Sequence, residues 1–319
     1  MADRSHWDAE MAAFTAEAEM AAARFPPIRL EIPLEPHRRV NDALSLLSAS
    51  GGPEMAETTE RWVAARGRRI FVRVYRPRTD RVLPTLVYFH GGGWVWGSVD
   101  THDRLVREIA ASGEVAVVSV DYALSPEAQF PQALEECAAV TRHVAAEAAA
   151  WGLDAGTLLV GGDSAGGNLA LAVALMLRDE GGPALSGVLA AYPVADSRLD
   201  TPSYGAYGDG SYGLSVARMA FYWNVYVPHA ADRLHPLAAP LRADLRGLPP
   251  VLVLLAELDV LRSEGEALVA RLREAGVPVE SASYAGVVHG FLRATGAVQK
   301  ARDAVARAAA WLRALPRAG

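Results

Sequence analysis

The segment Leu158–Asn168 holds the residues best suited to covalent chemistry, in the pattern Gly162-x-Ser164-x-Gly166. An apolar run precedes the pattern and a run rich in alanine and leucine follows it, which predicts a buried strand, a sharp turn and a helix. A residue at the apex of such a turn has a strained backbone, so its neighbours must be small. The Ser164 hydroxyl would then lie beside the first helical amides, which lack intrahelical partners. This arrangement is typical of a nucleophile elbow, the alternative being an ordinary turn in which Ser164 caps the helix.

A serine hydroxyl becomes a nucleophile when a neighbouring base takes its proton, and histidine suits this role because its pKa lies near neutrality. His289 directly follows the last predicted strand, where the strand ends converge. His90 also follows a predicted strand, but it precedes a glycine run. His289 is therefore the predicted base, which agrees with the chain order of nucleophile, acid and histidine that accompanies such an elbow.

The base needs a carboxylate that holds its tautomer and stabilises the imidazolium. The apolar strand at 251–256 is followed by Glu257-Leu258-Asp259, so two acids compete for this role. Asp259 is favoured because it lies further into the loop, from which its side chain can reach the end of the next strand. Glu257 stays open as the rival acid.

Attack on a carbonyl places negative charge on its oxygen, and fixed N–H donors stabilise that charge. The amide of Ala165, at the start of the predicted helix, is one expected donor. The run Gly91-Gly92-Gly93 supplies others, because glycine lets the backbone approach a substrate closely. In this reading His90 binds loop carbonyls rather than taking part in catalysis.

The elements that must position these residues alternate between strand and helix along most of the chain. That alternation predicts a mainly parallel sheet covered by helices on both faces. Strands are expected at residues 69–75, 83–90, 115–122, 158–160, 187–192, 251–256 and 279–284. Helices are expected at residues 103–112, 131–151, 169–175, 264–274 and 301–315.

Two segments break the alternation. Before the first strand, helical spacing predicts an amphipathic helix at 8–25 and a short helix at 40–50. Later, residues 196–248 contain no convincing strand but many aromatic residues, and a helix is expected at 214–226. These helices could form a lid that covers Ser164 with an apolar pocket, or the aromatic side chains could simply pack the insert onto the core. Trp94 and Trp96, after the glycine run, present the same choice between lining a pocket and anchoring a loop.

Composition restricts the function further. The chain has 319 residues, of which 51% are hydrophobic, enough for one large α/β unit. Its formal net charge of −6 and lack of basic runs disfavour a nucleic-acid partner. The single cysteine, Cys137, is expected to be a buried hydrophobic residue. The polar N-terminus and the lack of long apolar runs predict a soluble, cytoplasmic protein with no membrane span.

Four motifs in combination resemble the hormone-sensitive-lipase family of carboxylesterases, also called bacterial family IV. They are His90-Gly91-Gly92-Gly93-Trp94, Asp121-Tyr122-Ala123-Leu124-Ser125-Pro126-Glu127, Gly162-Asp163-Ser164-Ala165-Gly166-Gly167-Asn168 and His289-Gly290-Phe291. The resemblance implies that Ser164, Asp259 and His289 are a catalytic triad. It also implies that the amides of Gly91, Gly92 and Ala165 form the oxyanion hole.

The fold implied is an α/β-hydrolase fold, with a mostly parallel eight-stranded sheet flanked by helices and a helical cap. Residues 1–54 would form N-terminal cap helices, and residues 55–319 the catalytic domain with a cap insertion at about 196–248. The chain departs from the family at two places. Its acid loop reads Asp259-Val260-Leu261-Arg262-Ser263 where the family often has Asp-Pro-Leu-Arg-Asp, which keeps Glu257 as an alternative. Ala123 stands where the family commonly has arginine, so an ion pair that could hold that loop is expected to be missing.

We therefore expect a serine carboxylesterase that hydrolyses short- to medium-chain acyl esters of small molecules through an acyl-enzyme, without a metal or organic cofactor. One alternative is an amide hydrolase similar to arylformamidases. Another is a non-catalytic ligand receptor on the same fold, although such a receptor would be expected to lose the nucleophile or the base. A homodimer through the last strand is common in similar proteins.

Overall fold

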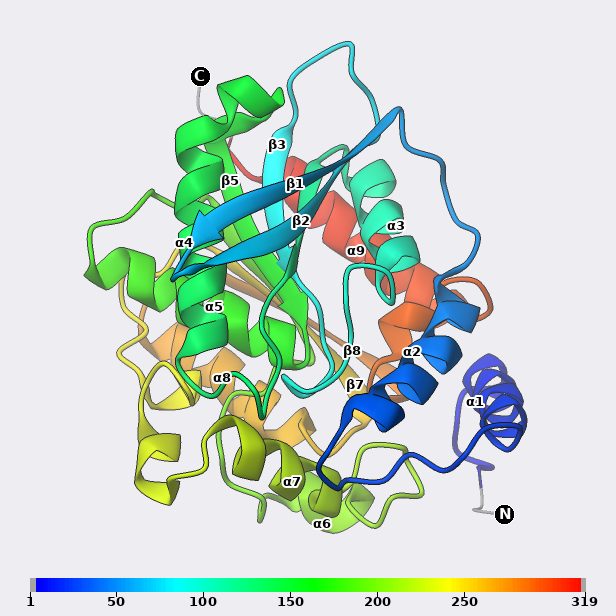
Figure 1. Ribbon diagram of the computed structural model, residues 1–319. Coiled ribbons are helices and arrows are strands. Elements are labelled where there is room, and N and C mark those ends of the chain that lie inside the picture. Colours follow the sequence, from blue (N-terminus) through cyan, green and yellow to red (C-terminus); the bar gives the residue numbers. More distant parts are fainter. Residues whose placement is uncertain (1–3, 317–319) are drawn as a thin grey trace.

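A computed structural model describes residues 4–316, which fold around one eight-stranded sheet (Figure 1). The strand order is β1-β2-β4-β3-β5-β6-β7-β8; β2 is antiparallel to β1 and β4, and all other neighbours are parallel. The strands are β1 (Glu57–Ala65), β2 (Arg68–Arg76), β3 (Pro84–Phe89), β4 (Ala116–Asp121), β5 (Asp154–Asp163), β6 (Gly187–Ala191), β7 (Val251–Leu258) and β8 (Val279–Val288). The prediction of a mostly parallel eight-stranded sheet is confirmed.

The central strands are apolar along their length because helices cover both sheet faces. Two buried clusters of apolar side chains result, one on each face. The first face is covered by α4 (Gln132–Glu147), α5 (Ala165–Asp179) and α8 (Arg262–Glu274), and the second by α3 (Asp103–Gly113) and α9 (Gln299–Ala314). Short 3-10 helices lie at η1 (Ala149–Trp151) and η4 (Phe291–Ala294). Cys137 is buried in the first cluster, as expected.

Strand β1 is the element that the strand predictions missed. Its residues are mostly polar or charged and only Val63 is buried, so it lacks the apolar pattern of the other strands. Its strand conformation comes from antiparallel pairing with β2. The two strands are joined by a tight turn at Arg66 and Gly67, both of which have positive φ.

The N-terminal helices are α1 (Ala9–Ala22) and α2 (Glu35–Ala49). Asp8 caps α1 by accepting a hydrogen bond from the Met11 amide at 3.0 Å. The predicted helix is present as α1, and Met11 is its only buried residue, so the helix lies at the surface of the protein. Helix α2 begins five residues earlier than predicted, since Pro36 is well tolerated in its first turn.

The insert after β6 contains α6 (Pro202–Tyr207), α7 (Val216–Tyr226) and the 3-10 helices η2 (Ala230–Leu234) and η3 (Pro240–Arg242). Its predicted helix corresponds to α7, whose first turn is capped by Ser215. Trp223 and Tyr226 of α7 are fully buried, so the packing interpretation holds for these aromatic side chains. Helix α5 is tied to the insert by Asn168, whose side-chain amide donates to Val194 O and Ala238 O at 2.9 Å.

Candidate active site

The residues that the sequence singled out meet at one edge of the sheet, where the parallel strands end. Residues just beyond these ends are His90 after β3, Ser164 after β5, Tyr192 after β6, Asp259 after β7 and His289 after β8. Ligand and catalytic sites of open parallel sheets lie at such carboxyl ends, because the loops there converge.

Ser164 sits at a sharp turn between β5 and α5, with φ of 55° and ψ of −118°. A side chain on Gly162 or Gly166 would overlap the carbonyl oxygen of Phe89, so both flanking positions require glycine. The strained conformation is held by backbone hydrogen bonds, with the Ser164 amide donating to Ala191 O at 2.8 Å. The predicted strand, turn and helix are therefore all present, and Ser164 stays 8% exposed.

A continuous hydrogen-bonded chain runs from the nucleophile candidate to the acid candidate. Ser164 Oγ lies 2.8 Å from His289 Nε2, and His289 Nδ1 lies 2.7 Å from Asp259 Oδ2. Asp259 is 2% exposed, and its other oxygen accepts the Leu261 amide at 3.0 Å. Because an ionised carboxylate only accepts hydrogen bonds, it holds the imidazole with its proton on Nδ1 and leaves Nε2 to accept from Ser164.

The rival acid, Glu257, has a different partner. It is still part of β7, and its Oε2 accepts the Gly286 amide of β8 at 2.7 Å. Within residues 4–316, Asp259 is the only carboxylate in contact with His289. The irregular pairing register between Ala256 and Leu258 marks where β7 gives way to the acid loop.

The expectation that the Gly91 amide is an oxyanion donor is wrong in this structure. That N–H donates to Asp163 Oδ1 at 3.0 Å, so it is already occupied. The carbonyl of the same peptide, His90 O, accepts the Tyr122 hydroxyl at 2.7 Å. This peptide is therefore held at both ends and turned into the protein.

The next two peptides are held at their carbonyls only. Gly91 O contacts His90 Nδ1 at 2.8 Å, and Gly92 O accepts the amides of Val95 and Trp96 at 3.0 and 2.9 Å. In a trans peptide the N–H points opposite to the carbonyl, so these bonds aim the amides of Gly92 and Gly93 away from the protein side. In the described part of the chain, the amides of Gly92, Gly93 and Ala165 have no hydrogen-bond acceptor.

Gly93 belongs to the glycine run that was expected to supply donors, but the family resemblance assigned this role only to Gly91 and Gly92 of that run. Both Gly92 and Gly93 have positive φ, of 126° and 60°. A Cβ on Gly92 would overlap Trp96 O, and one on Gly93 would overlap the Tyr222 ring, so neither position admits another residue.

The two tryptophans after the glycine run anchor it to α7. Trp94 is fully buried and stacks on Tyr226 with ring centroids 4.1 Å apart. The Trp96 indole N–H donates to the Tyr222 hydroxyl at 2.9 Å. Segment 91–97, called the oxyanion loop below, is therefore packed against the insert.

His90 holds a loop carbonyl, as the sequence predicted. Its ring is fully buried, and burial together with the nearby His102 lowers the pKa of His90 to about 3. The ring is neutral at ordinary pH, and its Nδ1 must carry the proton in order to donate to Gly91 O.

This burial predicts a pH-dependent contribution to stability. An unfolded chain protonates His90 near pH ~6.5, whereas the folded protein resists protonation until about pH 3. Between these two pH values the unfolded state therefore binds more protons than the folded state. The contribution of neutral His90 to the free energy of unfolding is complete above pH ~6.5 and is lost as the pH falls below it. Between pH 8 and pH 5 the wild type should lose about 2 kcal/mol more than His90→Gln, measured by urea unfolding. An equal loss in both proteins would show that His90 does not titrate as a buried neutral group.

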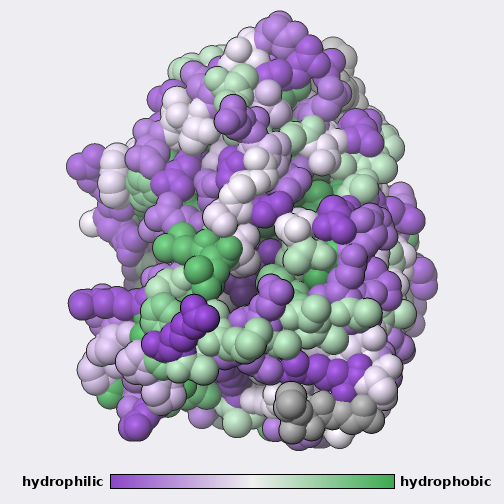
Figure 2. All heavy atoms as spheres, turned by 90° about the vertical axis from the view of Figure 1, so that its right-hand side faces the viewer, coloured by the Kyte–Doolittle hydropathy of each residue, from purple (hydrophilic) through white to green (hydrophobic). Residues whose placement is uncertain are grey.

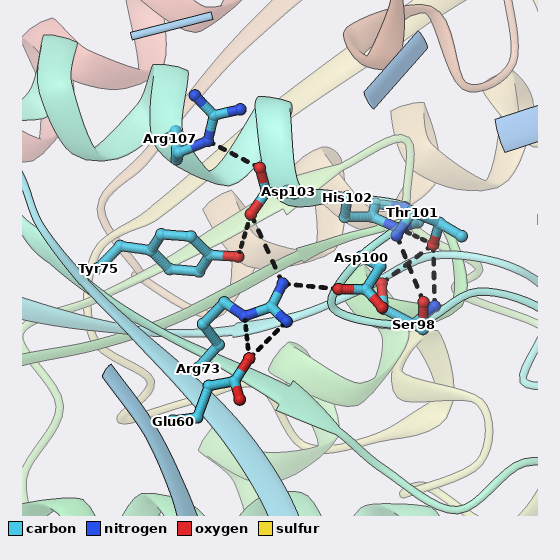
Figure 3. A network of polar contacts seen from close by, with 9 residues as sticks. All are labelled: Glu60, Arg73, Tyr75, Ser98, Asp100, Thr101, His102, Asp103 and Arg107. Atoms are coloured by element: carbon cyan, nitrogen blue, oxygen red, sulfur yellow. Dashed lines mark hydrogen bonds and ion pairs between the residues drawn. The ribbon is translucent and has the colours of Figure 1, made fainter. Parts of the chain in front are cut away.

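A polar network anchors the segment after the oxyanion loop (Figure 3). Arg73 of β2 donates to Asp100 at 2.7 Å, and in the same segment Thr101 Oγ1 contacts His102 Nδ1 at 3.0 Å. His102 Nε2 lies 3.5 Å from the buried Asp163, the residue that accepts the Gly91 amide. Burial alone would raise the pKa of Asp163. His102, the Tyr88 hydroxyl and Arg293 outweigh this effect and hold the pKa of Asp163 well below its usual range. An ionised acceptor thus fixes the start of the oxyanion loop.

The loop around Ala123 is held without the arginine that is common in the family. The Ala123 amide donates to Glu136 Oε2 at 2.9 Å, and Glu136 is fully buried in α4. The other oxygen of Glu136 accepts from Gln132 at 3.1 Å and lies 3.4 Å from Arg68 Nε. Ala123 itself can form no ion pair, but Arg68 of β2 places a cation beside Glu136, so the loop is held by other contacts.

Across residues 4–316, no group of three or more His, Cys, Asp or Glu side chains is arranged to hold a metal ion. Nor is any helix in that range long and apolar enough to cross a bilayer.

Comparison with known proteins gives consistent results. Residues 86–293 match a family described as having the alpha/beta hydrolase fold. Carboxylesterase NlhH of Mycobacterium tuberculosis is 39% identical over 248 residues, which cover 76% of this chain and 77% of that protein. Ethyl acetate hydrolase of Pseudomonas putida is 33% identical over 294 residues, covering 90% and 92% of the two chains. The crystal structure of a thermostable esterase from Pseudomonas putida ECU1011 superimposes with a TM-score of 0.92 at 35% identity and covers all of both chains.

These matches agree with the strand order, the elbow and the glycine loop described above. The chain is an enzyme of the α/β-hydrolase family, in its hormone-sensitive-lipase-like branch.

Proposed function

We propose that this enzyme is a serine carboxylesterase that hydrolyses short- to medium-chain acyl esters through an acyl-enzyme. The observation that carries the proposal is the hydrogen-bonded chain from Asp259 through His289 to Ser164, next to unpaired backbone amides. Its relatives named above, a carboxylesterase and an ethyl acetate hydrolase, support an ester as substrate.

Acylation begins when Ser164 Oγ attacks the ester carbonyl carbon and His289 Nε2 takes the hydroxyl proton. The carbonyl oxygen becomes an oxyanion, and the amides of Gly92, Gly93 and Ala165 are the donors available to it. His289, now an imidazolium stabilised by Asp259, gives its proton to the leaving alkoxide oxygen. The carbon–oxygen bond breaks, the alcohol leaves and the acyl group stays on Ser164.

Deacylation repeats the sequence with water as nucleophile. His289 takes a proton from water as the water oxygen attacks the acyl carbon, and the same amides donate hydrogen bonds to the new oxyanion. When the tetrahedral intermediate collapses, the proton returns to Ser164 Oγ. The carboxylic acid leaves and the free enzyme is restored.

The N-terminal helices and the insert would form the cap over this site, with residues 1–54 and about 196–248 as its two parts. Tyr222 of α7 packs on Gly93, so the insert reaches the proposed oxyanion hole directly. Figure 2 shows the face that carries α1 and α2, where a hollow is bordered on one side by an apolar patch. The N-terminal segment exposes the large apolar side chains Met20, Phe25, Ile32, Leu46 and Leu47.

Labelling combined with a substrate series tests this function. A fluorophosphonate probe should modify Ser164 stoichiometrically, as seen by peptide mass spectrometry, and abolish turnover of p-nitrophenyl esters. In a series from acetate to palmitate, kcat/KM should be highest for short to medium chains. Labelling without turnover of any ester, or a clear preference for aryl formamides, would contradict the proposal.

A further inference from the structure

Arg38 of α2 makes an unusual set of contacts with the catalytic domain. Its Nε donates to Val95 O at 3.0 Å and its Nη2 to Ser125 O at 2.7 Å. The same guanidinium forms a fork on Glu127, with distances of 2.8 and 2.7 Å to the two carboxylate oxygens. One side chain of the N-terminal segment thus binds two separate loops of the catalytic domain at once.

The two carbonyls are more informative than the ion pair. Glu127 is 61% exposed on its side chain, so its pairing with Arg38 contributes little by itself. Val95 and Ser125 are fully buried. Among residues 4–316, Arg38 is the only hydrogen-bond donor to their two carbonyl oxygens. Leaving buried carbonyls unpaired is costly, so removal of the guanidinium should make these loops move toward other donors or water.

Both contacted loops belong to the oxyanion region. The Val95 amide is one of the two donors that hold Gly92 O, and this bond orients the peptide that carries the Gly93 amide. The Ser125 amide donates to Trp94 O at 2.7 Å, so the loop that contains Ser125 is also hydrogen-bonded to the oxyanion loop. A shift at Val95 or Ser125 would therefore be transmitted to a proposed oxyanion donor through a single hydrogen bond.

We propose that Arg38 is a positioning residue that couples docking of helix α2 to the geometry of the oxyanion hole. The N-terminal segment then has a second role beside covering the site: when α2 is docked, the oxyanion loop is braced in its reactive shape. This inference rests on the proposed esterase function, because its effect appears in ester turnover.

Arg38→Met tests the coupling, since methionine keeps an apolar stem and removes every donor. We expect kcat for p-nitrophenyl butyrate to fall about 10-fold, less than the 10²–10³ of a deleted oxyanion donor, with KM changed less than about twofold. Arg38→Lys should lie between wild type and Arg38→Met, because one ammonium group cannot reproduce the planar fork. The matched control is Arg39→Met: Arg39 is the next residue of α2, its side chain is 77% exposed, and among residues 4–316 it pairs only with Glu35 of the same helix.

The assays are run well below the melting temperature of each variant, with the melting temperature measured in parallel. A lower melting temperature with unchanged kcat in Arg38→Met would overturn the coupling and make Arg38 a stabilising contact only. If Arg38→Met does not fold, Arg38→Lys decides, and wild-type kcat in that variant would overturn the proposal. Should the wild type hydrolyse no ester, the proposed function fails before this question arises, so the two failures are distinguishable.

Discussion

Ser164→Ala should lower kcat for p-nitrophenyl esters by about 10⁶-fold, the effect of deleting the nucleophile of a serine triad. Without Oγ no acyl-enzyme can form, and His289 Nε2 loses its hydrogen-bond partner. The residual rate would come from binding and from the amides of Gly92, Gly93 and Ala165, which the substitution leaves in place. Turnover is measured at saturating ester concentration with a variant preparation that contains no wild-type enzyme, because traces of active enzyme would dominate the signal.

The fold should survive this change. Alanine and serine meet the same backbone strain at a φ of 55°, so the substitution adds no new conformational cost. Ser119→Ala is the control, since Ser119 is a fully buried serine whose hydroxyl has no partner within residues 4–316. It should keep wild-type kcat. Unchanged turnover in Ser164→Ala would remove the serine mechanism altogether.

The position of Ser164 could be predicted from sequence because the requirement is local. The carbonyl of Phe89 leaves no room for side chains at Gly162 and Gly166, and this steric need is visible as the glycine pattern. His289 and Asp259 were accessible for a different reason: they follow neighbouring parallel strands, and the topology brings such strand ends together. The apolar run of β7 made the position of Asp259 at its end predictable.

Which of the glycine amides are free to act as oxyanion donors could not be predicted in this way. Three consecutive glycines offer three equivalent amides to a sequence reader. The difference arises from Asp163, which lies 72 residues away and removes the Gly91 amide by a hydrogen bond. Pairings of this kind depend on side-chain placement in three dimensions, so the sequence pattern alone points to the loop but not to the peptide.

Tertiary context also explains the errors at the edges of the fold. Strand β1 has one buried residue, Val63, so no periodicity signals it, and pairing with β2 alone makes it a strand. Helix α1 shows a different limit, because apolar residues at helical spacing predicted the helix correctly, although only Met11 of that helix is buried. Apolar periodicity reports the possibility of burial, whereas burial itself depends on the neighbouring elements.

Asp259→Asn should lower kcat about 10⁴-fold while leaving the backbone of the acid loop in place. The hydrogen bonds at this residue explain why. Oδ1 accepts the Leu261 amide at 3.0 Å, so the asparagine must keep its oxygen there and turn its NH₂ group toward His289. Nδ1 would then have to accept, which places the imidazole proton on Nε2, facing Ser164 Oγ. In that tautomer the imidazole cannot take the serine proton, and no carboxylate is left to stabilise an imidazolium.

Glu257→Gln is the control that separates the two acids. Its Oε2 accepts the Gly286 amide, a bond that a glutamine oxygen can also accept, so strand pairing should persist and kcat should stay near wild type. Both variants are compared by kcat over pH, with circular dichroism as the check on folding. A large loss in Glu257→Gln with little change in Asp259→Asn would reassign the acid, because the 2.7 Å contact to His289 Nδ1 would then not be the catalytic one. The expected outcome, a loss confined to Asp259→Asn, ties the rate to the tautomer that this contact selects.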